Sequence, residues 1–379
     1  MRTAEAQRTP SFFLTQSHEE GCLIQFASDT SDQSDQSDQS DQSVEPRMVV
    51  GNVSVLCGPN AGGTPAVPGT PVLPGEPVGY MTFPFNRHRP GNQRAGIFSE
   101  NAEILAHEAH AADQFVLRLR APECARHAAP GSFVHLRCDP RLPLRRPLSI
   151  MRASPRDHWV ELLYKVVGTG TRLLALKQPG DYLGMLGPIG HPFRTHPEHP
   201  RPLLIGGGVG MPPMVFLADS LCSDRRFRPF VILGSEVPFP FRPCPSRHLV
   251  PTLPPPVIAA MPLLDDWDIP SRLTSLSDLP GCFRGYVTDL ARQWLQGLDT
   301  AARAEVEVFA CGPHAMLAAV AALAREFGLP CQVSLEEFMA CAVGGCAGCV
   351  VQVRGEAEPT MQRVCVDGPV FDAYAVFGS

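Results

Sequence analysis

The chain has 379 residues, of which 44% are hydrophobic and 18% charged, enough for two or three domains with apolar cores. Its net charge of −6 and its lack of a basic stripe argue against nucleic acid as a partner. The N-terminal residues lack the apolar region of a secretory signal, and no run of about 20 apolar residues could span a membrane. We therefore expect a soluble, cytoplasmic protein with no membrane partner.

Residues 1–94 are predicted to be a disordered leader and linker. A Ser-Asp-Gln repeat runs from Ser31 to Ser43, and such a polar tract cannot offset the entropy lost on ordering. A stretch rich in glycine and proline follows from Gly58 to Pro77 and is typical of a linker.

From residue 95 to 198 the pattern changes to short strands. Residues 114–120, 132–136 and 160–167 alternate or carry β-branched residues, and Gly, Pro and Asp separate them. This spacing predicts a small antiparallel β-barrel.

Two short motifs in this region are typical of phosphate and ring contacts. In Arg146-Pro147-Leu148-Ser149, extended backbone would let the arginine reach a phosphate and the serine a ring edge. The sequence Gly168-Thr169-Gly170-Thr171 precedes a predicted helix, whose first turn can bind pyrophosphate. Each motif is also common by chance, so an ordinary strand and turn stay open as alternatives.

Residues 199–333 are predicted to form a Rossmann-like NAD-binding α/β domain. A buried strand at 202–205 enters Gly206, Gly207, Gly208, Val209 and Gly210, and a helix with early prolines follows at 211–218. The motif is not a strict G-x-G-x-x-G, so a simple tight turn remains an alternative. Strands at 229–234 and 306–310 follow, and the second ends at Cys311-Gly312-Pro313 before a helix at 314–327. The proline-rich stretch 238–256 is expected outside the core.

Four cysteines mark residues 334–379 as a small cluster segment. Cys341, Cys346 and Cys349 follow C-x4-C-x2-C spacing, and Cys365 follows after fifteen intervening residues, a pattern typical of a plant-type [2Fe–2S] cluster. Small residues lie between the ligands, where backbone must wrap closely around sulfur. Structural zinc is the alternative, although it usually uses two facing C-x2-4-C pairs. A disulfide framework fits less well because nothing marks the chain as secreted.

These motifs in this order resemble the electron-transfer subunits of NAD-linked dihydroorotate dehydrogenases, within the ferredoxin–NADP reductase superfamily. The resemblance covers residues from about 95 to the end and includes the ending Arg363-Val364-Cys365 with Asp367-Gly368-Pro369. It implies an FAD-binding barrel, an NAD(H) domain and a C-terminal [2Fe–2S] segment. It also implies an oxidoreductase component without a catalytic residue of its own. The implied partner is an FMN-containing catalytic subunit of a heterotetramer that oxidises dihydroorotate to orotate in pyrimidine biosynthesis.

The resemblance also assigns roles to single residues. Arg146 would hold the FAD phosphates, while Pro147, Leu148 and Ser149 would line the isoalloxazine. A second flavin-contacting strand would supply Leu163, Tyr164 and Lys165, and Gly170 with Thr171 would bind phosphate. The NAD(H) site would comprise Gly206, Gly207, Gly208, Gly210, Gly312, Pro313 and Cys311, the last near the nicotinamide.

Three departures from the family leave other partners open. The gap between Cys349 and Cys365 is long, Phe338 stands where a basic residue is expected, and the leader is foreign to the family. One alternative is a reductase-type subunit that serves a hydrogenase, a sulfur-metabolising enzyme or a glutamate-synthase-like complex. Another is a zinc-stapled interaction protein on a degenerate reductase scaffold.

Overall fold

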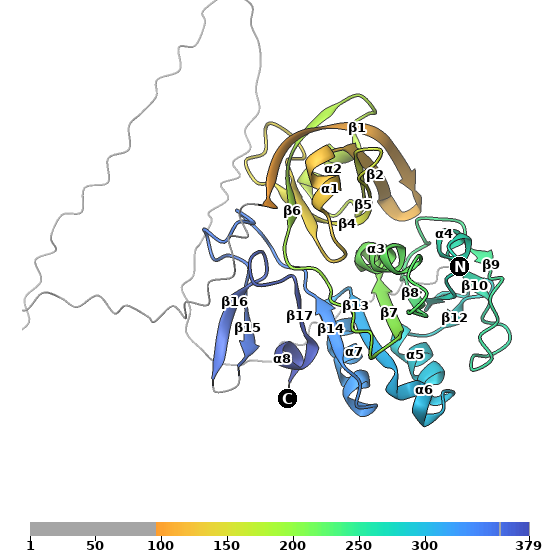
Figure 1. The fold of residues 1–379 in the computed structure, drawn as a ribbon. Helices are drawn as coiled ribbons and strands as arrows, with labels where there is room; N and C mark the ends of the chain where they lie inside the picture. The colour runs from red at the N-terminus through yellow and green to blue at the C-terminus, as the bar shows by residue number, and fades with distance from the viewer. Residues whose placement is uncertain (1–95, 356–357, 379) are drawn as a thin grey trace, which may run out of the picture. The chain divides into compact units, whose positions relative to one another are not determined.

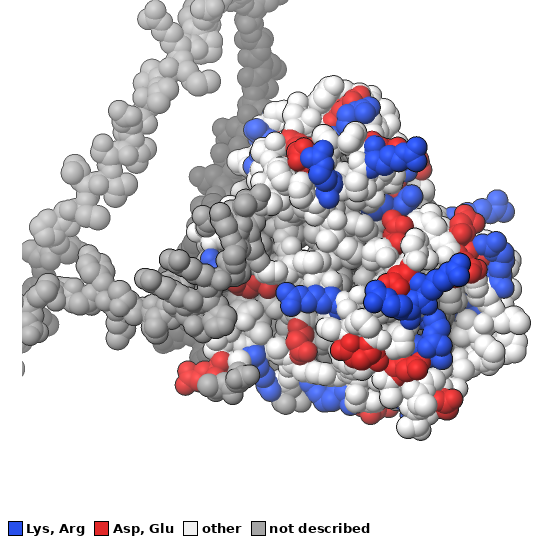
Figure 2. All heavy atoms as spheres, viewed as in Figure 1, with Lys and Arg blue, Asp and Glu red and all other residues white. Residues whose placement is uncertain are grey.

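The computed structural model describes residues 96–355 and 358–378 (Figure 1). The predicted leader, residues 1–94, lies outside these ranges. In the described ranges no helix is both long and apolar enough to cross a membrane. Figure 2 shows basic and acidic side chains interspersed on the face in view, without an extended area of one sign.

The first part of the fold is a closed antiparallel barrel in the order β1-β2-β5-β4-β3-β6, as predicted. Alternate residues such as Leu117, Leu119 and Leu162 fill its interior because successive strand side chains point to opposite faces. The strands are β1 (Phe98–His110), β2 (Gln114–Arg120), β3 (Phe133–Leu136), β4 (Arg146–Ser154), β5 (Trp159–Lys165) and β6 (Tyr182–Ile189); a 3-10 turn η2 (Ala111–Asp113) and the helices α1 (Pro122–His127) and α2 (Thr169–Ala175) connect them.

The second part is a seven-stranded sheet in the order β12-β11-β8-β7-β13-β14-β17. All its strand pairs are parallel except β14 with β17. The strand order reverses between β7 and β13, and ligands of such sheets bind at this switch point. The strands are β7 (Arg201–Gly207), β8 (Phe230–Gly234), β11 (Ser271–Ser275), β12 (Phe283–Arg284), β13 (Val306–Cys311), β14 (Cys331–Ser334) and β17 (Val370–Asp372).

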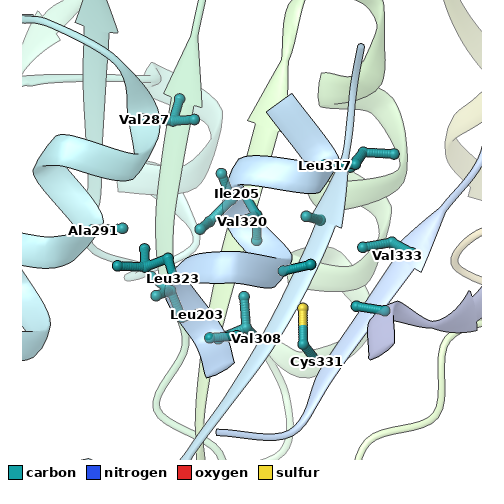
Figure 3. Packing of buried hydrophobic residues seen from close by; sticks show 14 of the residues in the cluster. Leu203, Ile205, Val287, Ala291, Val308, Leu317, Val320, Leu323, Cys331 and Val333 are labelled. Atoms are coloured by element: carbon teal, nitrogen blue, oxygen red, sulfur yellow. The ribbon is translucent and has the colours of Figure 1, made fainter. Parts of the chain in front are cut away.

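Helices cover both faces of this sheet. Leu317, Val320 and Leu323 of α7 pack on Leu203 and Val308 (Figure 3), and burial of each leucine stabilises the fold by about 1.5–3 kcal/mol. Helix α3 packs on the other face of the sheet and also contacts β4 of the barrel. The connecting elements are η3 (Gly208–Gly210), α3 (Met211–Leu221), α4 (Pro262–Asp266), α5 (Val287–Gln296), α6 (Thr300–Ala304) and α7 (His314–Glu326).

The C-terminal segment is tied to both other parts. Its hairpin, β15 (Val350–Arg354) with β16 (Pro359–Arg363), occupies the long gap between Cys349 and Cys365. Strand β17 then joins the sheet edge, and the helix α8 (Ala373–Phe377) follows. The amide of His191, just after the barrel, donates to the carbonyl of Gly368 at 2.6 Å.

The expectation that residues 238–256 lie outside the core is wrong. Phe239 and Leu253 are buried in the two cores of the sheet, and β9 (Cys244–Pro245) pairs with β10 (Ala259–Ala260). The physical reason lies on β11, where the buried Arg272 guanidinium donates to the carbonyls of Val257 and His248 at 2.8 and 2.7 Å. An arginine from the sheet therefore satisfies backbone groups that a buried, irregular segment would otherwise leave unpaired.

We expect the Arg272→Leu variant to lose about 3 kcal/mol of unfolding free energy, because it leaves buried carbonyls without donors. Urea denaturation would measure this loss, and limited proteolysis should show new cleavage between residues 244 and 257. Arg226→Leu is the matched control, since Arg226 is exposed and its contacts are with its sequence neighbours Asp224 and Phe227. Equal stability of the two variants would contradict this role of Arg272.

Candidate functional site: a cysteine loop, a flavin strand and a glycine turn

The loop at 341–349 directs backbone N–H groups at cysteine sulfur. The amides of Gly345 and Cys346 donate to the Cys341 Sγ at 3.2 and 3.4 Å, and the amide of Gly348 donates to the Cys346 Sγ at 3.4 Å. Gly344 has φ +79°, and a Cβ there would lie 2.5 Å from the Val366 side chain. The small residues thus let the loop close around its thiols, as the sequence predicted.

The four thiols lie close enough to shift one another's pKa values. Burial raises the pKa of Cys341, but hydrogen bonds from backbone amides and from the Cys346 side chain outweigh it, and the net pKa lies below the usual range. Burial raises the pKa of Cys365, and the adjacent Cys349 raises it further. Cys341 also raises the pKa of Cys365, so the thiols of the loop and of Cys365 influence one another.

The backbone amides bear on the choice between the candidate metal sites. Structural zinc usually uses two facing pairs of cysteines, each on its own short turn. A [2Fe–2S] cluster is held by four thiolates, and hydrogen bonds to its sulfurs tune it, so three cysteines on an amide-lined loop fit it better.

The disulfide alternative finds no support among the described residues. All eleven cysteines there are free, the four of the cluster loop included. Cys349 and Cys365 are buried, Cys341 is partly exposed and Cys346 is exposed.

The two predicted phosphate motifs of the barrel lie side by side. A Cβ on Gly170 would stand 2.8 Å from the Nε of Arg146, so the guanidinium packs against the start of α2. The Thr171 hydroxyl accepts hydrogen bonds from the amides of Val167 and Gly168 and donates to the Gly168 carbonyl. Thr171 therefore shapes the turn, and Arg146 brings positive charge to it.

The other predicted flavin residues take different orientations. Leu148 packs against the barrel core, so Pro147 and Ser149 point to the outer face of β4. Tyr164 is buried inside the barrel, where its hydroxyl lies 2.9 Å from the Nε2 of His107, so a flavin could contact this residue only through its backbone. Leu163 lies outside the barrel and lines a 260 Å³ cavity with Met211 of α3, whereas Lys165 ends β5, half-buried.

We expect the Arg146→Gln variant to bind FAD about 10- to 100-fold more weakly, because a charged hydrogen bond contributes about 1.5–3 kcal/mol. Fluorescence titration of the flavin-free protein would measure the dissociation constant. Arg126→Gln is the control, because Arg126 lies on the exposed surface beside Glu123. Unchanged affinity in Arg146→Gln would contradict the assignment.

The predicted nucleotide motifs meet at the switch point of the sheet. A Cβ on Gly210 would lie 2.4 Å from the backbone carbon and oxygen of Cys311, so only glycine fits there. A Cβ on Gly207 would similarly lie 2.4 Å from the Met316 sulfur. Gly206 ends β7, Gly208 has φ +55° and open space around it, and Gly312 and Pro313 follow β13.

The sequence analysis did not identify one residue of this site, Glu336. The Cys311 thiol lies 3.9 Å from the Oε1 of Glu336, and burial raises the pKa of both groups. Glu336 thus brings a carboxyl group to the end of β13 from the segment that leads to the cluster loop. Its only sequence signal is its position five residues before Cys341.

Comparisons with known proteins agree with this arrangement. The family model of the iron-sulfur cluster binding domain of dihydroorotate dehydrogenase B matches residues 336–377. Among curated proteins, the dihydroorotate dehydrogenase B (NAD(+)) electron transfer subunit of Desulforamulus reducens is 31% identical over 73% of this chain and 97% of its own length. That of Geobacillus thermodenitrificans is 33% identical over 72% and 96%.

A solved structure is also similar. A chain of the NADH-dependent reduced ferredoxin-NADP oxidoreductase, described for flavin-based electron bifurcation, matches with a TM-score of 0.59 and 28% identity. The match covers 73% of this chain and 90% of that one. On the extent and identity of the curated matches, the chain belongs to the family of dihydroorotate dehydrogenase B electron transfer subunits.

Proposed function

We propose that this chain is an oxidoreductase component that relays electrons between NAD(H), FAD and a [2Fe–2S] cluster. Its partner is an FMN-containing catalytic subunit that oxidises dihydroorotate to orotate, in a cytoplasmic heterotetramer. The observation that carries the proposal is the cysteine loop, whose spaced thiols and inward amides suit a cluster. The curated relatives of nearly equal length support the choice of partner.

The chain's own residues bind and orient the cofactors. When bound, FAD can exchange a hydride with NAD(H) and pass single electrons on, and the cluster carries one electron at a time. We assign Arg146 and Gly170 to the FAD phosphates, and Pro147 and Ser149 to the flavin ring. The turn at 206–210 and Cys311-Gly312-Pro313 would hold NAD(H).

Each proposed cofactor site lies in a different part of the fold. Residues 95–198 bind FAD, 199–333 bind NAD(H) and 334–379 hold the cluster through Cys341, Cys346, Cys349 and Cys365. Oxidation of dihydroorotate releases two electrons and two protons, and NAD+ takes up both electrons with one proton. The proton from dihydroorotate is removed by the partner, so this chain needs no general base for that step.

A visible spectrum of the anaerobically purified protein, titrated with NADH, tests the relay. Flavin and cluster absorption that both bleach with NADH would support it, whereas a colourless protein containing zinc would refute it. Co-purification with the FMN subunit should then give dihydroorotate-dependent reduction of NAD+. A coloured, NADH-reducible protein that does not oxidise dihydroorotate with that subunit would refute the partner alone.

A second candidate keeps the cofactors and changes the partner. The likeness to a chain of the NADH-dependent reduced ferredoxin-NADP oxidoreductase favours it, as does Phe338, which is 93% exposed three residues before Cys341. In that case the NADH titration would succeed, and the protein would co-purify with a catalytic subunit of another kind.

A further inference from the structure

Arg363 links the part of the chain that carries the fourth cysteine to the loop that carries the other three. It ends β16, two residues before Cys365, and its Nη1 donates a hydrogen bond to the carbonyl oxygen of Gly344 at 3.2 Å. Gly344 has φ +79°, and a Cβ there would lie 3.3 Å from this Nη1. The loop backbone therefore packs closely against the guanidinium.

The peptide group between Gly344 and Gly345 has contacts at both of its polar ends. Its carbonyl accepts from Arg363, and its N–H, which belongs to Gly345, donates to the Cys341 Sγ at 3.2 Å. A hydrogen bond accepted by a carbonyl polarises the peptide group and strengthens the bond that its N–H donates. The guanidinium of Arg363 thus acts on the Cys341 sulfur through a single peptide group.

Asp367 orients the Arg363 side chain. Its carboxylate accepts a hydrogen bond from the Arg363 amide at 2.7 Å and lies 3.5 Å from the Arg363 Nε. The Asp367 amide in turn donates to the Arg363 carbonyl at 2.7 Å. The two side chains are 37% and 30% exposed, so the ion pair by itself adds little stability. It fixes one side of the guanidinium, while the Nη1 reaches Gly344.

Backbone bonds already hold the cysteines of these two parts together. The amide of Val364 donates to the carbonyl of Cys349 at 2.9 Å, and β15 pairs with β16 over all five residues of each strand. These bonds do not involve the guanidinium, so its removal should leave the hairpin intact. The contact of Arg363 with Gly344 therefore bears mainly on the hydrogen bond to Cys341.

We propose that Arg363 is a positioning residue that raises the reduction potential of the cluster through the Gly344–Gly345 peptide group. Hydrogen bonds to cysteine sulfur stabilise the extra negative charge of a reduced cluster, and so they raise its potential. By strengthening such a bond, Arg363 makes the cluster a better acceptor for each single electron from FAD. This inference rests on the proposed function, in which Cys341 is a cluster ligand.

The test compares three variants of the full chain. Arg363→Met keeps the apolar stem and removes the donors, whereas Arg363→Lys keeps the charge but lacks the forked guanidinium. Arg354→Met is the matched control, because Arg354 is an exposed arginine of the same hairpin. It lies four residues along β15 from Val350, which stands opposite Arg363, and so about 13 Å away.

The first readout is the midpoint potential of the loaded cluster, followed by electron paramagnetic resonance during a redox titration. We expect Arg363→Met to lower the equilibrium constant for cluster reduction about 10-fold, which is about 59 mV for a one-electron couple. Arg363→Lys should recover less than half of the shift in potential. Arg354→Met should stay within about 2-fold of the wild type, because solvent and salt screen an exposed charge at that distance. An unchanged potential in Arg363→Met, or full recovery in Arg363→Lys, would overturn the proposal.

The second readout is hydrogen exchange of the protein without cofactors and with its thiols reduced. We expect the amides of residues 344–346 to exchange about 10-fold faster in Arg363→Met, since a lost hydrogen bond contributes about 1 kcal/mol. The amides of residues 350–354 should keep their rates, and equal acceleration in both segments, or none, would overturn the proposal. This readout applies even where Arg363→Met assembles no cluster. If the wild-type protein binds no cluster, the proposed function fails instead, and exchange still judges the contact of Arg363.

Discussion

Replacement of Cys346 by serine is expected to remove the cluster and to stop electron transfer to the partner, while NADH still reduces FAD. Loss of residues that only support a metal ligand typically costs 10- to 100-fold in affinity or activity, so loss of a ligand should exceed about 100-fold. Cys346 is exposed, and its sulfur accepts the Gly348 amide within the same loop, so the fold itself should survive the change.

Three measurements separate these effects. The cluster absorption and its electron paramagnetic resonance signal should vanish, the flavin spectrum should still bleach with NADH, and dihydroorotate-dependent NAD+ reduction should fall. Cys222→Ser is the matched control, since Cys222 is an exposed free cysteine at the end of α3. Retained transfer to the partner in Cys346→Ser would refute the relay through the cluster.

Replacement of Gly210 by alanine is expected to damage the nucleotide site and the fold together. The new Cβ would stand 2.4 Å from the Cys311 carbonyl carbon and oxygen, and backbone on a central strand cannot move aside easily. Overpacking of a core typically costs about 1–3 kcal/mol, and we expect the upper end here, or a fall in Tm of about 5–10 °C. The KM for NADH should rise more than about 10-fold as the strand ends are forced apart.

Gly208 provides the control within the same turn. Its φ of +55° disfavours alanine by about 1 kcal/mol, but no atom lies within 4 Å of the added Cβ. Gly208→Ala should therefore lower Tm only slightly, so its Tm is the control for the packing effect of Gly210→Ala. Similar defects in both variants would show that conformation, not contact with Cys311, limits the turn.

Motifs that require one particular residue type could be predicted from the sequence. The cysteine spacing predicted the cluster loop, and the glycines of 206–210 predicted the turn at β7 because few other residues fit such backbone. The strands β2, β7, β8 and β13 were predicted because their apolar residues lie on buried faces.

Features that depend on tertiary contacts could not be predicted from the sequence. Strand β1 is rich in Ala, Glu and His and only a few of its residues are buried, so its sequence lacks clear strand periodicity. It becomes a strand because it pairs with both β2 and β6 and closes the barrel. Arg272 of β11 pairs with the carbonyl of Val257 at the end of the segment that contains Leu253, and Glu336 lies near Cys311 beyond the paired strands β13 and β14. No local pattern encodes such distant pairs.

The addition of β17 to the sheet determines how this protein can be divided. Because Val370–Asp372 pairs with β14, a truncation before the cysteine loop would leave that edge open, and open edges promote aggregation. The excised cluster segment would in turn lose β14, the strand with which its own β17 pairs. The cluster segment is thus not a detachable ferredoxin module, and fusions of this reductase with another electron carrier should retain the chain through α8.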